Sequence, residues 1–102
     1  MELPVSPCKA LCQKNFTVIY DKLNASEESV TWCNTGSLTN LCILLLTYPD
    51  IKSKISRIVM MGGAVEKGNI TPAAEFNIFF DPHSMAEVLN LKGDIPLFMI
   101  PL

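Results

Sequence analysis

The sequence has little of what a zinc centre, a membrane span or a nucleic-acid interface requires. It contains one histidine and four cysteines without a C-x-x-C pair, which argues against a zinc site. No apolar run approaches the roughly 20 residues that a transmembrane helix needs. Eight lysines and arginines against ten aspartates and glutamates give a net charge of −2, and no basic stripe is present to follow a phosphate backbone. We therefore predict a soluble protein that binds neither membranes nor nucleic acids.

The first residues also lack the features of a secretory signal. An acidic residue stands at position 2, Pro4 and Pro7 follow, and there is no apolar core. We therefore expect a cytoplasmic protein with reduced thiols. Cys8 and Cys12 lie one helical turn apart, a spacing open to a metal or a redox pair, but small buried thiols are the favoured interpretation.

Composition and periodicity predict one small domain in which helices and strands alternate. Hydrophobic residues make up 49% and charged residues 18% of the 102 residues, which is typical of a packed domain and not of a disordered chain. The expected elements are a helix over 7–23, a buried strand over 30–33, an almost wholly buried helix capped by Ser37 or Thr39 and ending before Pro49, a helical turn over 50–55, a strand over 57–61, a helix over 81–92 with Met85, Val88 and Leu89 inward, and a strand over 95–100.

Strands that are rich in branched residues and separated by helix-length segments are typical of parallel β-α-β units. The predicted fold class is therefore α/β, a partial doubly wound parallel sheet of about three strands with flanking helices. The sequence stops directly after its third strand, which would leave a sheet edge unpaired and a face uncovered. We accordingly expect residues 1–102 to be part of a larger domain.

A long connection over 62–80 is the main candidate for a functional loop. Ligands of open α/β sheets bind beyond the carboxyl ends of the strands, and this loop follows the second strand. Asn69, Glu75 and Asn77 supply the mixture of acceptors and amide donors that vicinal hydroxyls require. In an extended segment Glu75 and Asn77 would point the same way and share a ligand. The alternative is that Asn69 forms a turn with Gly68 and that Glu75 is a solvated loop acid.

Three other features carry no chemistry in this interpretation. Gly62-Gly63 follows a strand, but the G-x-G-x-x-G spacing of a dinucleotide site is missing. His83 is expected to be an exposed residue in the first turn of a helix. Ser37 has neither a nearby histidine nor a nucleophile-elbow sequence, which excludes a serine hydrolase of that type.

Two blocks of the sequence resemble a known family, the calcium-dependent nucleoside hydrolases that prefer inosine and uridine. The first is Thr35-Gly-Ser-Leu-Thr-Asn-Leu, close to the family's T-G-P-L-T-N-[IL] with Ser37 in place of proline. The second is Met61-Gly-Gly followed by Gly68-Asn-Ile-Thr-Pro-Ala-Ala-Glu-Phe-Asn and Asp81-Pro. The similarity extends from the first predicted helix through Pro101.

The resemblance implies hydrolysis of the N-glycosidic bond of ribonucleosides to base and ribose. It assigns the backbone carbonyl of Thr35 to Ca²⁺, and Met61, Asn69, Glu75 and Asn77 to the ribose pocket. In such enzymes Ca²⁺ binds the ribose diol and acidifies a water molecule, and an aspartate takes the proton. The sugar passes through an oxocarbenium-like state, which the groups around the ribose stabilise.

The departures from the family pattern concern the metal and the catalytic acid-base groups. The D-x-D-P-G-x-D-D segment and the later His-Asp segment of the family are absent from this sequence. Because Ca²⁺ requires several anionic oxygens, we expect weak binding of Ca²⁺ and no catalysis by this chain alone, so no catalytic residue is assigned. The alternative is a non-catalytic truncated protein that retains the ribose-binding loop and pairs with itself or with a full-length relative through its sheet edge.

Overall fold

The structure is a computed structural model that describes residues 16–102. Its elements are α1 (Phe16–Ala25), β1 (Val30–Asn34), α2 (Thr39–Thr47), the 3-10 helix η1 (Pro49–Lys54), β2 (Ile55–Met61), α3 (Phe76–Phe80), α4 (Pro82–Leu91) and β3 (Leu97–Ile100). Every predicted strand is present, with ends shifted by one or two residues. The start of the first predicted helix, with Cys8 and Cys12, lies outside the described residues.

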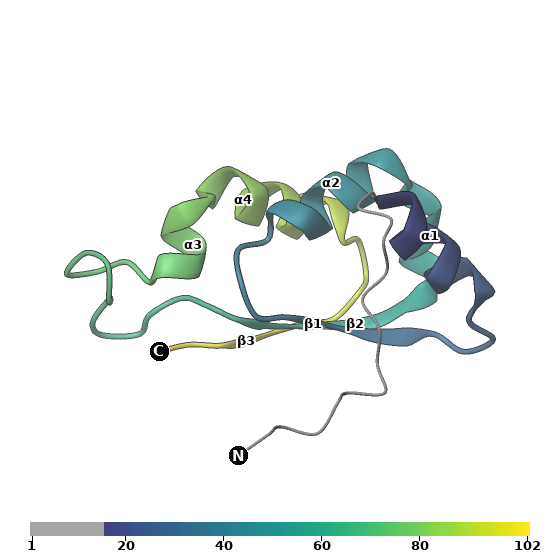
Figure 1. Cartoon of the computed structure of the whole chain (residues 1–102). Coiled ribbons are helices and arrows are strands. Elements are labelled where there is room, and N and C mark those ends of the chain that lie inside the picture. Colours follow the sequence, from purple (N-terminus) through teal and green to yellow (C-terminus); the bar gives the residue numbers. More distant parts are fainter. Residues whose placement is uncertain (1–15) are drawn as a thin grey trace, which may run out of the picture.

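The three strands form one parallel sheet in the order β1-β2-β3. Each crossover moves the chain one strand further in the same direction, and right-handed crossovers that keep one direction place their helices on one side. Figure 1 shows this arrangement, with α1, α2, α3 and α4 all above the sheet. The predicted α/β class, a parallel sheet with flanking helices, is confirmed.

The hydrophobic core lies between the sheet and its helical layer. Leu41, Leu44 and Leu45 of α2 are fully buried against Ile58 of β2 and Val88 of α4. The core therefore depends on α2, which is the helix nearest the middle of the sheet in Figure 1.

Three burial predictions are wrong because, among the described residues, helices cover only one face of the sheet and the outer side of these helices is open. Helix α2 was expected to be almost wholly buried, yet Ile43 and Leu46 are 39% and 57% exposed on its outer side. Leu89 of α4 is likewise exposed, and β1 alternates between exposed and covered residues.

Among the described residues no helix is long and apolar enough to span a bilayer, and α2 has only nine residues.

The end of the long connection after β2 is helical, so the prediction of a continuous loop over 62–80 is wrong. Residues 76–80, Phe-Asn-Ile-Phe-Phe, form the short helix α3, which lies beyond the carboxyl ends of the strands (Figure 1). Aromatic and β-branched residues have modest helix propensity, so the pattern of this segment gave no helical signal. Side chains that precede α3 accept hydrogen bonds from its first N–H groups and account for its formation.

Candidate functional site

The predicted site residues Thr35, Met61 and Asn77 meet at the carboxyl ends of β1 and β2. Asn77 Nδ2 donates to the carbonyl oxygen of Met61 at 3.0 Å and to that of Thr35 at 3.3 Å. The Met61 sulfur lies 3.2 Å from the same nitrogen. One amide thus bridges the ends of two neighbouring strands from a helix more than 40 residues away from Thr35 in the sequence.

Glu75 is buried, with only 2% of its surface exposed, although it follows a surface loop. Its Oε1 accepts from the backbone N–H of Asn77 at 2.9 Å. Its Oε2 accepts from the N–H groups of Gly63 at 3.1 Å and Ile78 at 3.3 Å. Both sequence-based expectations for Glu75 are therefore wrong: it is no solvated loop acid, and it does not share an extended segment with Asn77, because Glu75 is the N-cap of α3.

Asn69 also directs its side chain at the start of α3. Its Oδ1 accepts from the backbone N–H of Phe76 at 2.8 Å. The loop before it closes on itself, since Gly68 N donates to Pro72 O at 3.1 Å and Asn69 N donates to Ala74 O at 3.0 Å. No regular turn forms at Gly68 and Asn69; instead the chain bends over residues 69–73, which brings Asn69 to the start of α3.

The two glycines after β2 provide room for the Glu75 carboxylate. A Cβ at Gly62 would lie 3.3 Å from Glu75 Oε2 and 2.9 Å from the Met60 methyl carbon. Gly63 has a φ of +80°, a conformation that side chains disfavour, and it donates its N–H to Glu75. The Gly-Gly pair is thus explained by the close approach of an acid and not by a phosphate.

The turn that carries the Thr35 carbonyl is held by a residue that the sequence analysis missed. Asn34, at the end of β1, is largely buried and donates from Nδ2 to the carbonyls of Gly36 at 2.6 Å and Ser37 at 3.1 Å. An asparagine directly before a Thr-Gly turn is the signal that points to this role, because its amide reaches carbonyls two and three residues ahead.

Asp81 connects the two sequence blocks that resemble the family. It caps α4 by accepting from Ser84 N at 3.0 Å, and its Oδ2 accepts from Ser84 Oγ and Thr39 Oγ1, each at 2.6 Å. The hydrogen bonds from Ser84, followed by that from Thr39, lower the pKa of Asp81 to about 2. Neither Ser37 nor Thr39 caps α2 as predicted, since the helix begins after Leu38 without a side-chain cap.

The described residues do not by themselves suit a calcium ion. No group of three or more His, Cys, Asp or Glu side chains gathers anywhere in residues 16–102. The Thr35 carbonyl already accepts from Asn77, and both oxygens of Glu75 accept from backbone N–H groups. Since a hard divalent cation takes six to eight oxygen ligands, no step of chemistry is assigned to a metal here.

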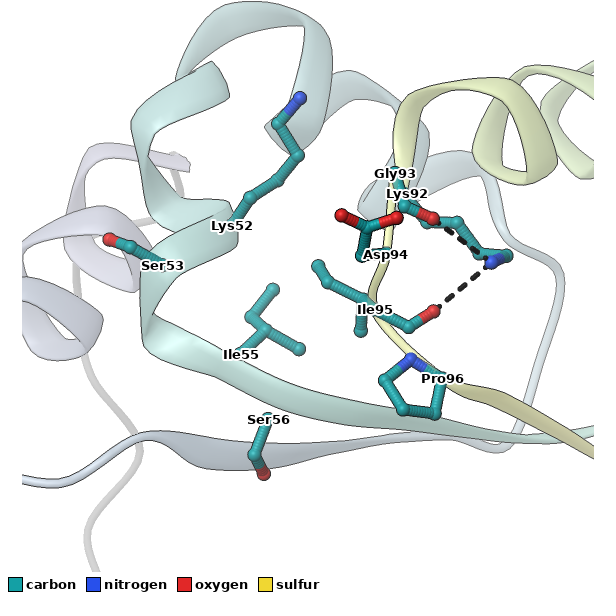
Figure 2. A pocket seen from close by; sticks show the side chains of 9 residues that line it. All are labelled: Lys52, Ser53, Ile55, Ser56, Lys92, Gly93, Asp94, Ile95 and Pro96. Carbon is teal, nitrogen blue, oxygen red and sulfur yellow. Dashed lines mark hydrogen bonds between the residues drawn. The ribbon is translucent and has the colours of Figure 1, made fainter.

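An open hollow of about 420 Å³ lies at the opposite end of the sheet, where η1 leads into β2 and the turn after α4 leads into β3. Figure 2 shows its lining, with the Lys92 ammonium turned to the carbonyls of Gly93 and Ile95 at 3.2 and 3.1 Å. The Lys92 ammonium is thus already hydrogen-bonded to two backbone carbonyls. None of the predicted site residues lines this hollow.

Comparison with known proteins gives one consistent result. A sequence profile of the family described as "Inosine-uridine preferring nucleoside hydrolase" matches residues 2–102. The pyrimidine-specific ribonucleoside hydrolase RihA of Escherichia coli O127:H6 is 46% identical over an alignment that covers 97% of this chain and 32% of that protein.

Solved structures agree with the sequence comparison. An inosine-uridine preferring nucleoside hydrolase from Bacillus anthracis has a TM-score of 0.81 at 33% identity, over 90% of this chain and 32% of that one. A purine-preferring ribonucleoside hydrolase from Gardnerella vaginalis has a TM-score of 0.79 at 33% identity, over 100% of this chain and 32% of that one. The chain thus spans about a third of the length of these relatives.

Proposed function

We propose, from the premise that this chain belongs to the family of inosine-uridine preferring nucleoside hydrolases, that it forms the ribose-binding part of a ribonucleoside N-glycosidase. In the complete reaction the bond between ribose and base is hydrolysed. Met61, Asn69, Glu75 and Asn77 are the residues proposed to surround the sugar. We place this function in the cytoplasm, in keeping with the free thiols of Cys33 and Cys42.

The observation that carries this proposal is the placement of Asn77. Its amide nitrogen is held by the carbonyls of Thr35 and Met61, so the position of the whole carboxamide is defined. Fixing Nδ2 in this way leaves Oδ1 to accept a hydrogen bond from a sugar hydroxyl. The site lies at the carboxyl ends of parallel strands, which is where open α/β sheets bind their ligands.

The base preferences of the relatives support a role in binding the sugar and not the base. RihA is described as pyrimidine-specific, whereas the Gardnerella vaginalis relative is described as purine-preferring. Both share this region with the present chain. The ribose is the part that purine and pyrimidine ribonucleosides have in common. Because this region occurs in relatives with either base preference, it is best suited to recognise ribose.

We further propose that residues 1–102 do not hydrolyse ribonucleosides alone. Thr35 would supply one carbonyl to the Ca²⁺ of an intact family member, and the remaining ligands would come from outside residues 16–102. Without those anionic ligands neither the metal nor an activated water is held. A calcium-supplemented hydrolysis assay that shows turnover by the purified chain would overturn this part of the proposal.

Sugar binding is tested by NMR titration of the ¹⁵N-labelled chain with uridine. We expect uridine to shift the signals of Met61 and Asn77, and 2′,3′-dideoxyuridine, which lacks the diol, to leave them in place. Asn77→Ala should abolish the shifts. Asn90→Ala, which removes an exposed amide on α4, is the matched control and should retain them. Equal shifts with both nucleosides would contradict recognition of the diol.

A second candidate function is that of an interaction protein, and the exposure of β3 favours it. Strand β3 pairs only with β2 among the described strands, and its residues Phe98 and Ile100 are exposed. Such an edge is able to pair with another strand. Size-exclusion chromatography with light scattering, alone and with a purified full-length relative, tests this. A chain that stays monomeric and does not bind the relative would rule the interaction function out.

A further inference from the structure

Helix α3 depends mainly on polar side chains, because Ile78 is its only residue that packs against the core. It has five residues, none of them buried, and a helix of this length is not stable without outside support. Each of its first three backbone N–H groups has a side-chain acceptor: Asn69 accepts from Phe76, and Glu75 accepts from Asn77 and Ile78. These N–H groups have no partner within the helix, so the caps satisfy them.

We propose that Asn69 and Glu75 also act as positioning residues, which build α3 so that it delivers Asn77 to the ends of β1 and β2. This inference rests on the proposed function, because Asn77 is one of the residues proposed to contact the sugar. It adds a second task to the ribose-pocket roles that the resemblance implies for Asn69 and Glu75. The polar atoms through which Asn69 and Glu75 act are already engaged by backbone N–H groups of the same loop and helix.

Glu75 also fixes where α3 lies relative to the sheet. Its Oε2 accepts from Gly63, directly after β2, and from Ile78 of α3, so one oxygen joins the strand end to the helix. A buried carboxylate is costly unless several donors surround it, and bonds to an ionised acceptor are stronger than neutral ones. The missing side chain of Gly62 gives the carboxylate its place. The carboxylate of Glu75 and the space at Gly62 therefore fit one another, and together they hold α3 at the end of β2.

The test is backbone amide hydrogen exchange of the full 102-residue chain by NMR, without any nucleoside. In Glu75→Gln one carboxylate oxygen becomes an NH₂ donor, so whichever way the amide turns, one group of N–H donors loses its acceptor. We expect exchange to become roughly tenfold faster at Ile78 and Gly63, or at Asn77, which corresponds to one lost buried hydrogen bond. The side-chain NH₂ signals of Asn77 should move toward those of a free amide.

Matched variants separate positioning from other roles. Asn77→Ala removes the group that is positioned, and it should leave the protection of Gly63 and Ile78 unchanged. Glu66→Gln alters an exposed acid of the same loop and should change nothing. Asn69→Ala should speed exchange at Phe76 about as strongly, whereas Asn69→Asp keeps the acceptor and should restore protection.

Three results would overturn the inference. They are unchanged Asn77 side-chain signals in Glu75→Gln, unchanged protection of Phe76 in Asn69→Ala, and loss of Ile78 protection in Asn77→Ala. If Glu75→Gln does not fold, the Asn69 pair still decides the matter. None of these measurements uses a ribonucleoside, so a chain that keeps these caps but fails to bind uridine would contradict the proposed function alone.

Discussion

Helices α2 and α3 lie on the same side of the sheet but are held in place by opposite means. Helix α2 has nine residues, four of which are buried, and it has no side-chain cap. Helix α3 has five residues, none of them buried, and side chains accept from its first three N–H groups. Helix α2 is stabilised mainly by apolar burial, and α3, of which only Ile78 packs against the core, mainly by hydrogen bonds.

The difference separates the part of the molecule that sustains the fold from the part that forms the candidate site. Apolar burial is not directional, so α2 packs over the sheet without needing exact angles. Hydrogen bonds are directional, so the caps of α3 define the position of Asn77 closely. The candidate site must hold the Asn77 amide against two carbonyl oxygens, and this requires the directional support that hydrogen bonds give.

The largest expected effect comes from emptying the core under α2. Leu44→Ala should lower the free energy of unfolding by about 3 kcal/mol, because it leaves a cavity in the fully buried part of the core. Phe79→Ala in α3 removes an exposed ring and should cost about 0.5 kcal/mol or less. Urea denaturation measures both. Equal losses would break the comparison between the two helices.

A smaller effect is expected when the loop before α3 is forced open. A Cβ at Gly68 would collide with the backbone of Ala74 and Thr71, so Gly68→Ala should cost about 2 kcal/mol and release Asn69 from Phe76. Gly36→Ala meets nothing nearby and is the control. Denaturation gives the stability loss, and exchange at Phe76 shows whether it is local. A neutral Gly68→Ala would mean that this loop does not support α3.

The Asp81 link between α2 and α4 should make part of the stability depend on acidity. The folded chain lowers the pKa of Asp81 from 3.8 to about 2, so its contribution is present above pH 3.8 and is lost as the pH falls through about 2. Asp81→Asn should therefore be less stable than the parent at pH 6, and the gap should close near pH 2. Denaturation midpoints across this range test the sign. A gap that widens in acid would contradict it.

The smallest expected effect is that of Ca²⁺ on the isolated chain. With one candidate carbonyl and no cluster of acids among residues 16–102, added Ca²⁺ should leave the midpoint of thermal unfolding unchanged, since only ligands that bind the folded state raise it. Mg²⁺ at the same concentration controls for ionic strength. A shift specific to Ca²⁺ would show that this region holds the metal without help.

Periodicity and turn chemistry were sufficient to predict most of the fold. The strands over 30–33, 57–61 and 95–100 and the Asp81 cap of α4 follow from branched residues and from the Asp-Pro start, which are local signals. The exposure of Leu46 was not predictable, because α2 is apolar on every side and the sequence does not show which side of it faces the sheet.

The proximity of the proposed site residues was predictable, but their contacts with one another were not. Thr35, Met61 and Asn77 were named together from sequence blocks, and the structure brings them within hydrogen-bonding distance. The burial of Glu75 was missed, because nothing local shows that Gly62 and Gly63, twelve or more residues earlier, open a space for its carboxylate. Contacts between distant backbone groups leave no periodic trace in a sequence.

The capping of α3 at a single end has a consequence for heat inactivation. A five-residue helix without buried side chains should detach from the strand ends on warming before the layer beneath α2 melts. Binding of the sugar would then vanish while circular dichroism still records an intact sheet. The highest temperature at which this region binds the sugar would be set by three capping hydrogen bonds and not by its core.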